Sequence, residues 1–564
     1  MSEDVFYRAL AEELGLRFEG KPRLSRGAKF PESLLAGFAP SVFRGRFVAA
    51  PIGEQVARLL KNRARFGELA ITTPSALRES VFALQAERIA AVAANRLPSM
   101  APHLSVRDGI SGAQIAALSA LSALLGFALG LDTGLVTLLL FAGLAMLFLV
   151  MVVLRCAAAF SGAPPGRRIQ ERRIPDAKLP VYTVVVALHR EAAIAGALIA
   201  SLERIDYPAA KLDIKLVLET DDCETRAALA AIALPAHMEI LSAPPGHPRT
   251  KPRALNVALP LARGVYTVVY DAEDVPDPDQ LRLAVDAFAA SGPEVACLQA
   301  HLAIDNTDDS FLTRCFTLEY AALFDVINPG LARLRLPVPL GGTSNHFRTE
   351  ALRRIGGWDA WNVTEDADLG IRLARLGYCV GDLASTTHEE APQTLRAWMH
   401  QRSRWMKGFV QTCVTHSRQP VATFRELGPV GFAGALTMTF GTVLSALGYP
   451  IFTLFVVAML VLGDTPASAT LGSVFLFYAS AALFALGAVA MLLPAAMSLR
   501  RRGLSHLWPL VFLLPFYYAL VSAAAWRALW ELAGDPFRWN KTEHGRARTS
   551  RTRQKLTPPS GNTG

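Results

Sequence analysis

Charged residues are scarce in this chain of 564 residues: 19% are charged, 52% are hydrophobic, and the mean hydropathy is +0.29. Several water-soluble cores would need more polar residues to coat them, so some apolar residues must face lipid. The net charge of +9 would suit nucleic acid, but many of the bases lie beside apolar stretches and near the C-terminus. Attraction to anionic lipid explains that distribution, and we expect no nucleic-acid partner.

Cysteine is also rare, and a secretory signal is lacking. The six cysteines have no C-x-x-C spacing, which argues against a zinc or redox centre, so we expect them to be reduced and structural. The first residues, Met1-Ser2-Glu3-Asp4, are acidic where a signal peptide is basic, and no apolar core follows before Gly20. The first hundred residues are therefore expected in the cytoplasm.

Long apolar stretches flank a more polar centre. Two of them, 113–131 and 133–154, approach the ~20 residues that a membrane-spanning helix needs, which predicts a transmembrane hairpin over 111–156. Arg155 and a basic run from Arg167 to Arg173 follow, and the positive-inside rule places them in the cytoplasm. We therefore expect a multi-pass protein of a bacterial-type inner membrane, with its central domain in the cytoplasm.

Apolar residues return over 428–533, in the stretches 430–463, 469–499 and 507–530, before a basic tail over 534–564. Arg500–Arg502 and the tail both favour the cytoplasm, yet one stretch interrupted at Pro515 separates them. A re-entrant or interfacial hairpin over that stretch would reconcile the charges.

The central region, 180–425, has the pattern of an α/β domain. Strand-like runs at 181–187, 214–218 and 265–270 alternate with helical segments such as 192–205, which predicts βα units around a parallel sheet. Ligands of such sheets bind at the carboxyl ends of the strands. Functional side chains are therefore expected directly after these runs.

Three acids follow one of the strands, at Asp271, Glu273 and Asp274. Such a cluster is costly unless it is solvated, paired or bound to a cation, and its hard oxygen ligands suit Mg²⁺ or Mn²⁺. The structural alternative is an acidic helix N-terminus beside Pro276.

A second acidic cluster, Thr364-Glu365-Asp366 with Asp368, opens a predicted helix. A hydroxyl that attacks a sugar carbon needs a general base, which a carboxylate at a helix terminus can supply. Thr364 can also act as an N-cap with acids in the first turn, and the two functions are compatible.

A basic helix then carries Gln401, Arg404 and Trp405 between the central domain and the apolar stretches. The Trp405 ring offers a flat apolar face for a sugar, and Arg404 can bind a diphosphate. The alternative is an interfacial amphipathic helix with a Trp anchor.

In this order and between apolar stretches, the three motifs resemble the processive family 2 inverting glycosyltransferases, which include the synthases of cellulose, curdlan, chitin and hyaluronan. The resemblance runs from Pro180 to about His416; the segments 251–256 and 341–345 are similar to the family's Lys-containing loop and acceptor loop. It implies an α/β GT-A-type, Rossmann-like domain inserted between transmembrane helices. It also implies transfer of a sugar from a UDP-sugar to a growing polysaccharide, processively and coupled to export.

The resemblance also implies roles for individual residues. Asp366, with Glu365 and Thr364, matches the catalytic motif, and Gln401, Arg404 and Trp405 match the acceptor and diphosphate motif. Nucleotide-sugar binding would involve Glu219, Asp221, Lys251 and Asp271. Asp271 and Glu273 would bind the metal ion, Mg²⁺ or Mn²⁺. The second acid of the family motif is usually Asp, whereas this chain has Glu273, so Asp274 is an alternative ligand. The segment after the second strand also departs, which leaves Glu219 and Asp221 as two candidates for the uracil contact.

Other readings remain open at this stage. UDP-glucose is the expected donor, because the resemblance leans toward β-glucan synthases, with UDP-N-acetylglucosamine as the main rival. A non-processive transferase acting on a lipid-linked acceptor is an alternative within the same chemistry. A non-catalytic membrane sensor or export component would leave the three motifs without a reason to occur together. A glycoside hydrolase needs paired carboxylates but no metal-type cluster.

Residues 1–100 form a separate small α/β module, with helices expected at 6–17 and 75–95. The phrases at 9–16 and 67–74 loosely resemble the N-terminal domain of type II secretion ATPases, some relatives of which bind cyclic di-GMP. The alternative is a scaffold that packs on the catalytic domain or on a partner protein. We expect regulation or scaffolding from this module, because it has no acidic cluster like those after Pro180.

Overall fold

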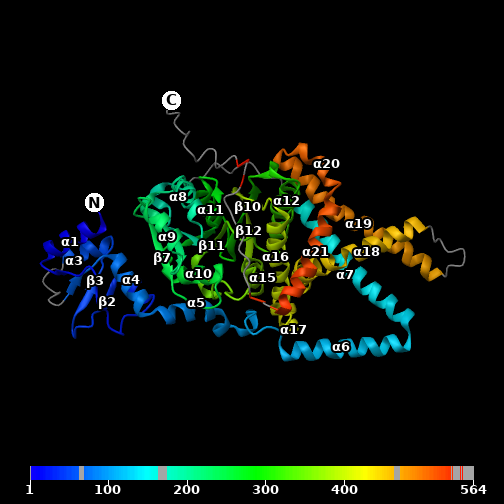
Figure 1. Ribbon diagram of the computed structural model, residues 1–564, viewed down its shortest axis with the longest axis horizontal. Helices are drawn as coiled ribbons and strands as arrows, with labels where there is room; N and C mark the ends of the chain where they lie inside the picture. The colour runs from blue at the N-terminus through cyan, green and yellow to red at the C-terminus, as the bar shows by residue number, and fades with distance from the viewer. Residues whose placement is uncertain are drawn as a thin grey trace.

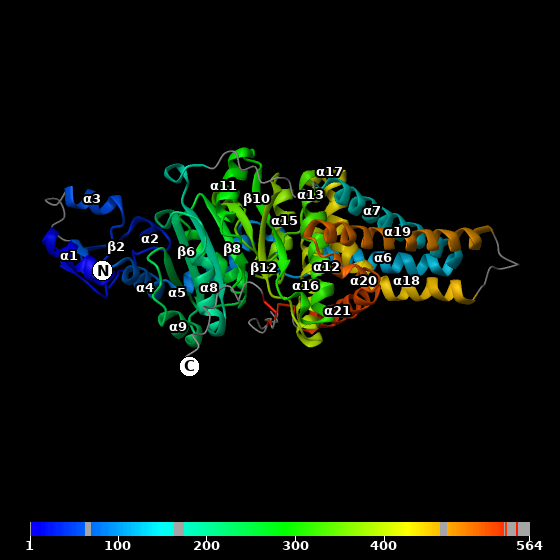
Figure 2. The same cartoon turned by 90° about the horizontal axis from the view of Figure 1, so that it is seen from above.

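The computed structural model describes residues 2–61, 69–162, 174–462, 471–534, 536–537, 547 and 549–550. The basic run 167–173 and most of the tail 534–564 lie outside the described residues. Three parts follow one another along the molecule: a small N-terminal domain, a central α/β domain and a set of long apolar helices (Figures 1 and 2).

The central domain contains an eight-stranded sheet in the order β7-β6-β5-β8-β11-β10-β12-β9. Its strands are β5 (Tyr182–Leu188), β6 (Leu212–Glu219), β7 (Met238–Ala243), β8 (Tyr266–Tyr270), β9 (Val275–Pro276), β10 (Val295–Ile304), β11 (Asn345–Arg348) and β12 (Cys379–Glu389). The expected parallel sheet is wrong in part, because β11 and β9 run antiparallel to their neighbours. Between β10 and β11 the chain forms α12 (Phe311–Ala322), η8 (Leu323–Ile327) and α13 (Asn328–Arg333), which pack against the apolar helices at the carboxyl end of the sheet. The chain therefore enters β11 from that end.

Helices cover both faces of this sheet. Val184 and Val186 face α8 (Ala195–Glu203) and α11 (Gln280–Ala290), whereas Val185 faces the opposite core with α10 (Lys251–Ala258) and α15 (Glu365–Arg375). Successive side chains of a strand point to opposite faces, so a continuous apolar run serves two cores at once. The sheet thereby fixes the strand ends that carry the polar motifs.

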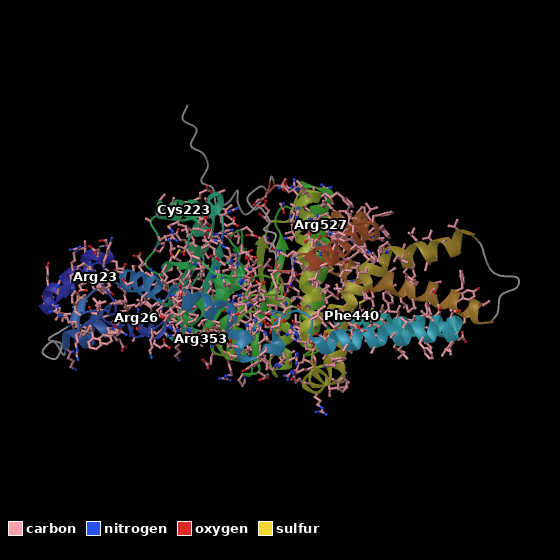
Figure 3. All side chains as sticks on the ribbon, turned by 60° about the horizontal axis from the view of Figure 1, so that its bottom comes forward. Arg23, Arg26, Cys223, Arg353, Phe440 and Arg527 are labelled. Atoms are coloured by element: carbon pink, nitrogen blue, oxygen red, sulfur yellow. The ribbon has the colours of Figure 1, made fainter. Side chains whose placement is uncertain are left out.

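The N-terminal domain has a four-stranded sheet in the order β1-β4-β3-β2, formed by Arg17–Phe18, Leu69–Ile71, Phe47–Ala49 and Phe38–Pro40. Helices α1 (Glu3–Leu14), α2 (Glu32–Ala36) and α3 (Glu54–Lys61) accompany it. Arg23 and Arg26, which belong to this domain, lie toward one end of the molecule, well away from Phe440 in the apolar helices (Figure 3). These two bases therefore do not lie beside the apolar helices.

The long helix expected at 75–95 is in fact two helices, α4 (Pro74–Leu84) and α5 (Ala86–Met100), which meet at Gln85. Helix α5 packs on the central domain: Ala93 shares a core with Leu255, and the Trp361 Nε1–H donates to the Ala94 carbonyl at 3.1 Å. Residues 86–100 thus pack on the central domain and share one buried core with both the central domain and the N-terminal module.

Removal of residues 2–72 should leave sugar transfer detectable, because Thr73, the N-cap of α4, and all of α5 remain. Removal of 2–100 should instead lower the melting temperature and the yield, because it uncovers the core under Ile89 and Ala93. Thermal unfolding and transfer per folded molecule would be measured for both truncations. Complete loss of transfer by a folded, membrane-inserted protein lacking only 2–72 would contradict a regulatory or scaffolding role.

Among the residues that the structure describes, four helices are long and apolar enough to cross a membrane: Gly112–Leu131, Thr133–Ser161, Pro420–Ala458 and Phe477–Arg502. They include α6 (Gly112–Leu131), α7 (Thr133–Ser161), α17 (Pro420–Leu436), η9 (Thr437–Gly441), α18 (Thr442–Leu462) and α19 (Leu471–Arg502). The expected interruption near Pro515 is confirmed, because Ser505–Val511 and Leu514–Gly534, which contain α20 and α21, meet at a bend of 64°. These helices indicate a membrane protein.

A charged network joins α19 to the central sheet. Arg502 donates to both oxygens of the Asp325 carboxylate, and Asp325 in turn accepts from His301 Nδ1 at 3.2 Å. His301 Nε2 lies 2.9 Å from Asp382 Oδ1. Burial lowers the pKa of His301, but the hydrogen bonds to Asp325 and Asp382 outweigh burial and raise this pKa to about 9. His301 is therefore charged at neutral pH.

The contribution of His301 to stability should depend on pH. Because its pKa is higher in the folded than in the unfolded protein, this contribution is complete below pH ~6.5 and is lost as the pH rises through about 9. The melting temperature of the wild type should therefore fall across this window. His301→Gln should have a lower melting temperature at pH 6 and a flatter profile above it. Equal slopes for the two proteins would contradict a charged His301.

Candidate active site

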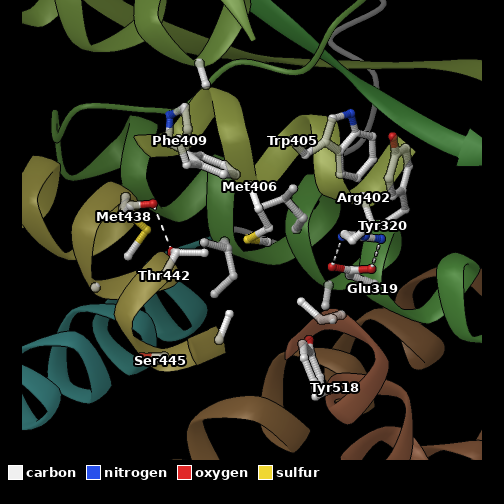
Figure 4. A pocket seen from close by; sticks show the side chains of 18 of the residues that line it. Glu319, Tyr320, Arg402, Trp405, Met406, Phe409, Met438, Thr442, Ser445 and Tyr518 are labelled. Atoms are coloured by element: carbon white, nitrogen blue, oxygen red, sulfur yellow. Dashed lines mark hydrogen bonds and ion pairs between the residues drawn. The ribbon is translucent and has the colours of Figure 1, made fainter. Parts of the chain in front are cut away.

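A cavity of about 780 Å³ lies where the carboxyl ends of the central strands meet the apolar helices. The sequence-predicted residues that line it are Lys251, Asp271, Glu273, Thr364, Glu365, Asp366, Gln401, Arg404 and Trp405. They come from the start of α10, the end of β8, the start of α15 and the middle of α16 (Leu395–His416). The three motifs, which are far apart in the sequence, thus converge on one cavity, and α16 forms one wall of it (Figure 4).

The part of the cavity lined by Lys251, Asp271, Glu273, Glu365 and Asp366, for which we propose a catalytic role below, is called the catalytic part. An ion pair between Lys251 and Asp271 lies within it. The Lys251 ammonium lies 2.5 Å from Asp271 Oδ1 and donates to the Gly342 carbonyl at 2.6 Å. Burial lowers the pKa of Lys251, but the carboxylates of Asp271, Glu365 and Asp366 outweigh burial, and the net pKa is raised. Lys251 is therefore a fixed positive charge among these acids, suited to a diphosphate as well.

Glu273 and Asp274 have different surroundings. Asp274 is 2% exposed, and its Oδ2 accepts from the Asp271 backbone N–H at 2.7 Å and from the Thr343 hydroxyl. Glu273 lines the cavity, whereas Asp274 is not among the described residues that do. Of the two candidate metal ligands, Glu273 is therefore the one that faces the cavity, and Asp274 holds the loop after β8 in shape.

The residues around this loop fit a divalent cation in part. Within the described segments, no three His, Cys, Asp or Glu side chains are arranged to hold a metal ion by themselves. Mg²⁺, however, is commonly bound by one or two carboxylates together with substrate phosphates. Glu389, at the end of β12, adds to the local acidity: burial, followed by Asp274, Glu273 and Asp271, raises its pKa, and its Oε1 has no hydrogen-bond partner. This excess of carboxylate oxygens is the chemistry that a hard cation would neutralise.

Asp366 and Glu365 stand next to each other at the start of α15. Asp366 Oδ1 accepts from the Ala367 backbone N–H at 2.8 Å, and a Cβ placed on Gly342 would lie 3.1 Å from Asp366 Oδ2 and 4.0 Å from Asp271 Oδ2. The absence of a side chain at Gly342 thus keeps open the space between the two carboxylates. Burial raises the pKa of Asp366, and burial followed by the Asp366 charge raises that of Glu365 to about 8.

The neighbours of these acids have structural roles. Thr364 occupies the N-cap position, but no cap hydrogen bond from its side chain occurs in the part of the chain that the structure describes. Its methyl and hydroxyl groups fill the space beside Gly408 of α16. Asp368 is fully buried and contacts His416 at 3.1 Å and Arg372 at 3.4 Å. Asp368 thus points away from the catalytic part, as its place in the helix predicted.

Helix α16 presents an aromatic wall to the cavity. The Trp405 ring stacks on Tyr320, with 6.1 Å between the ring centroids, and the Arg402 guanidinium lies 4.6 Å from the Trp405 centroid (Figure 4). Arg404 and Gln401 also line the cavity, and Arg404 Nε and Gln401 Oε1 are buried atoms without a hydrogen-bond partner. Unpaired polar atoms at such a place are suited to a ligand.

Several residues of the site are missed by the sequence motifs. Arg402 is buried and bonds both oxygens of Glu319 at 2.7 and 2.6 Å, and the Tyr517 hydroxyl donates to Glu319 at 2.8 Å. These hydrogen bonds hold the Arg402 guanidinium against the Trp405 ring and connect α16 to α12 and α21. His189 and Glu389 also line the cavity, each at the end of a strand. The position of these polar residues, His189 directly after β5 and Glu389 as the last residue of β12, is the sequence feature that could have identified them.

The two candidates for the uracil contact lie elsewhere. Both oxygens of Glu219 accept from Arg253 at 2.7 Å, and this guanidinium is fully buried. Asp221 is exposed and pairs with Arg249 at 2.5 Å. Neither acid is among the described residues that line the cavity. Glu219 is occupied by a buried ion pair, so Asp221 is the one that remains accessible to a nucleotide.

Comparison with known proteins agrees with this geometry. Residues 266–522 match the model of the family described as "Glycosyl transferase family group 2". This match identifies a glycosyltransferase family 2 domain over residues 266–522. Together with the preceding strands β5 to β7, this segment forms the mixed sheet, and several apolar helices accompany it.

Curated relatives share this domain. A "Beta-monoglucosyldiacylglycerol synthase" of Synechocystis sp. is 30% identical over 264 residues, which cover 45% of this chain and 53% of the relative. "Glucomannan 4-beta-mannosyltransferase 2" of Arabidopsis thaliana is 32% identical over 146 residues, 25% of this chain and 27% of the relative. The chain thus spans about half the length of the first relative and less of the second.

A solved structure also aligns with the chain. It is a mannosyltransferase of Pyrobaculum calidifontis in complex with GDP-Man and Mn²⁺, with a TM-score of 0.41 and 19% identity over 69% of this chain and 99% of the other.

Proposed function

We propose that this protein is a membrane-embedded inverting glycosyltransferase that transfers a sugar from a nucleoside diphosphate donor to a hydroxyl group of an acceptor. One observation carries the proposal: Asp366 faces Asp271 across Gly342, in a cavity that also contains Lys251, Arg404 and Trp405. A buried carboxylate, cationic groups for a diphosphate and an aromatic face for a sugar are the groups that this reaction needs.

The chemistry is a single displacement. Asp366 takes the proton from the acceptor hydroxyl as its oxygen attacks the anomeric carbon, the bond from this carbon to the diphosphate oxygen breaks, and the configuration inverts. Lys251 and Arg404 stabilise the negative charge of the departing diphosphate. A divalent cation held by Asp271 and Glu273 would supply further charge neutralisation when bound.

UDP-glucose is the first donor to test. The expected family favours a UDP-sugar, and the relatives' names include both a glucosyl and a mannosyl transferase. Processive synthesis of an exported polysaccharide is one candidate activity, supported by the Gln401, Arg404 and Trp405 motif and by the extension of the cavity into the apolar helices. Transfer to a lipid is the other, and one relative is named for a glycolipid product. The proposed location is the inner membrane, with the catalytic domain in the cytoplasm.

The direct test uses purified protein in phosphatidylcholine vesicles with a panel of UDP-sugars and GDP-mannose, Mg²⁺ or Mn²⁺, and a membrane lipid extract as acceptor. We expect one donor to release nucleoside diphosphate well above the others, with its labelled sugar recovered in a product. Absence of nucleotide release with every donor, by protein that is folded in the vesicles, would contradict the proposed function.

A further inference from the structure

The cavity changes character as it leaves the catalytic residues. Its inner part lies between α7, α18 and α19 and is lined by large apolar side chains, among them Phe141, Phe148, Met151, Phe452, Phe484 and Met491. Among the described residues that these three helices contribute to the lining, Arg155 is the only charged one. The total volume of about 780 Å³ is that of a site for a sizeable small molecule.

Of the four hydroxyl groups that α7, α18 and α19 contribute to the described lining, three are engaged by the protein, and the fourth, Thr453 Oγ1, has no hydrogen-bond partner. Thr442 donates to the Met438 carbonyl at 2.9 Å, and the Tyr449 hydroxyl donates to the Pro515 carbonyl at 3.2 Å (Thr442 and Met438 in Figure 4). Ser445 donates to the sulfur of Met151 at 3.7 Å. A sugar chain drawn through this space would lose its hydrogen bonds to water and find few replacements, which is costly for every hydroxyl. A hydrocarbon chain that enters from the bilayer has no hydrogen bonds to lose.

Arg155 lies near the C-terminal end of α7 and lines this cavity. Its Nε–H donates to the Ala490 carbonyl at 3.4 Å, and no ion pair involving Arg155 occurs among the residues that the structure describes. A cation in an apolar cavity is costly unless a partner bonds to it. An acceptor with oxygen atoms between its chain and its reactive hydroxyl would provide that partner.

We propose that the acceptor is a membrane lipid, with its hydrocarbon chain in the cavity between α7, α18 and α19, the oxygens of its linker on Arg155 and its headgroup hydroxyl at Asp366. This inference rests on the proposed function and names its acceptor. Sugar transfer then yields one glycolipid per turnover, and the product leaves sideways into the bilayer instead of passing through the protein as a polymer.

Two glycines provide a matched pair of variants. A Cβ at Gly448 of α18, which lines the cavity, meets no atom within 4 Å, so Leu at this position would fill the cavity without a clash at the backbone. Gly143 of α7 also has open space around its Cβ, and it is exposed and absent from the described lining. Gly448→Leu tests the cavity, and Gly143→Leu controls for an added Leu in a membrane helix.

The experiment uses full-length protein in phosphatidylcholine vesicles that carry either diacylglycerol or phosphatidylglycerol, each with dioleoyl or dihexanoyl chains. Released nucleotide and labelled sugar in the organic and ethanol-insoluble fractions are measured together. We expect organic-soluble product from at least one dioleoyl lipid, a reduction of ~10-fold or more in Gly448→Leu that is smaller for the dihexanoyl lipid, and no change in Gly143→Leu. Ethanol-insoluble polymer, nucleotide release without organic-soluble product, or equal losses for both chain lengths would overturn the lipid acceptor and leave the proposed function standing. Absence of nucleotide release would overturn the proposed function itself.

Arg155 is tested with the dioleoyl lipid that accepts sugar best. Arg155→Gln should raise the KM for this lipid by ~10-fold, the effect of losing a charged hydrogen bond, with kcat and the KM for the nucleotide sugar nearly unchanged. Arg155→Lys should restore much of the affinity, because it keeps the charge. An unchanged KM in Arg155→Gln would overturn the contact between Arg155 and the lipid. A preference between the two dioleoyl lipids tells whether the oxygens on Arg155 come from a phosphate or from an ester.

Discussion

Replacement of Asp366 by Asn should lower the rate of sugar transfer by roughly 10²- to 10⁴-fold, the usual effect of removing a general base. Asn keeps the size of the side chain and can still accept the Ala367 backbone N–H, so α15 should retain its start. Donor binding, measured by calorimetry with the nucleotide sugar, should be close to that of the wild type. Near-normal transfer, or a loss that follows from failure to bind donor, would contradict the role of Asp366.

Asp368 offers a control in the same turn of the helix. Because Asp368 is buried between His416 and Arg372, Asp368→Asn should lower the melting temperature, as expected when one partner of a buried ion pair is removed. Transfer per folded molecule should fall much less than in Asp366→Asn. The pair of variants thus separates loss of the base from loss of structure.

Transfer by the wild type should also depend on pH through Asp366. The base acts as a carboxylate, so activity falls as the pH drops through its pKa, and burial raises this pKa above the ordinary value of Asp. Because Glu365, with its pKa of about 8, lies beside it, the two acids should titrate together. The acidic limb of kcat/KM should therefore lie above pH ~4. Within this pair the Asp366 charge keeps Glu365 protonated while Asp366 itself titrates, so Glu365→Gln should leave the acidic limb nearly in place.

The sequence predicts where the acidic motifs lie in the fold, because each motif follows directly from local structure. Asp271 follows an apolar strand and Asp366 opens an amphipathic helix, and both features are visible within about ten residues. The carboxyl ends of strands in one sheet lie together, so separate motifs at these ends can be expected to meet. Asp271, at such a strand end, lines the same cavity as Asp366 and Trp405.

Contacts between distant segments could not be predicted in this way. The direction of β11 depends on where α12, η8 and α13 pack. Their position is set by contacts with the apolar helices, which the sequence of α12, η8 and α13 does not show. The same is true of Arg402, whose neighbours suggest an exposed basic helix, although it is buried against Glu319 of α12 and Tyr517 of α21. Neither the direction of β11 nor the burial of Arg402 is indicated by a periodic pattern in the sequence.

Local ambiguity also limited what the sequence could predict. Glu273 and Asp274 are adjacent acids, and only the fold shows that Asp274 turns inward to bond the Asp271 N–H and Thr343. Glu219 and Asp221 were equal candidates for the nucleotide contact in the sequence, and only the fold shows that Glu219 pairs with the buried Arg253. In both cases the partner comes from another part of the chain.

Removal of divalent cations should abolish sugar transfer, and Mg²⁺ or Mn²⁺ should restore it. The catalytic part gathers the three acids Asp271, Glu273 and Glu389, Lys251 forms an ion pair with Asp271, and an incoming diphosphate adds further negative charge. Like charges at this spacing are costly without a cation to bridge them. Transfer would be measured in excess EDTA and after titration with each metal. Full turnover in EDTA would contradict a metal-dependent reaction.

Single substitutions should then show which acid binds the cation. Glu273→Gln should lower transfer by ~10²-fold or more at low metal concentration and raise the metal concentration needed for half-maximal activity, because Glu273 faces the cavity. Asp274→Asn should leave the metal titration nearly unchanged and lower the melting temperature instead, because its buried Oδ2 holds the Asp271 backbone and Thr343. The reverse pattern, with the metal requirement shifted by Asp274→Asn alone, would mean that the loop after β8 turns over when the nucleotide sugar binds. Asp274, rather than Glu273, would then be the ligand.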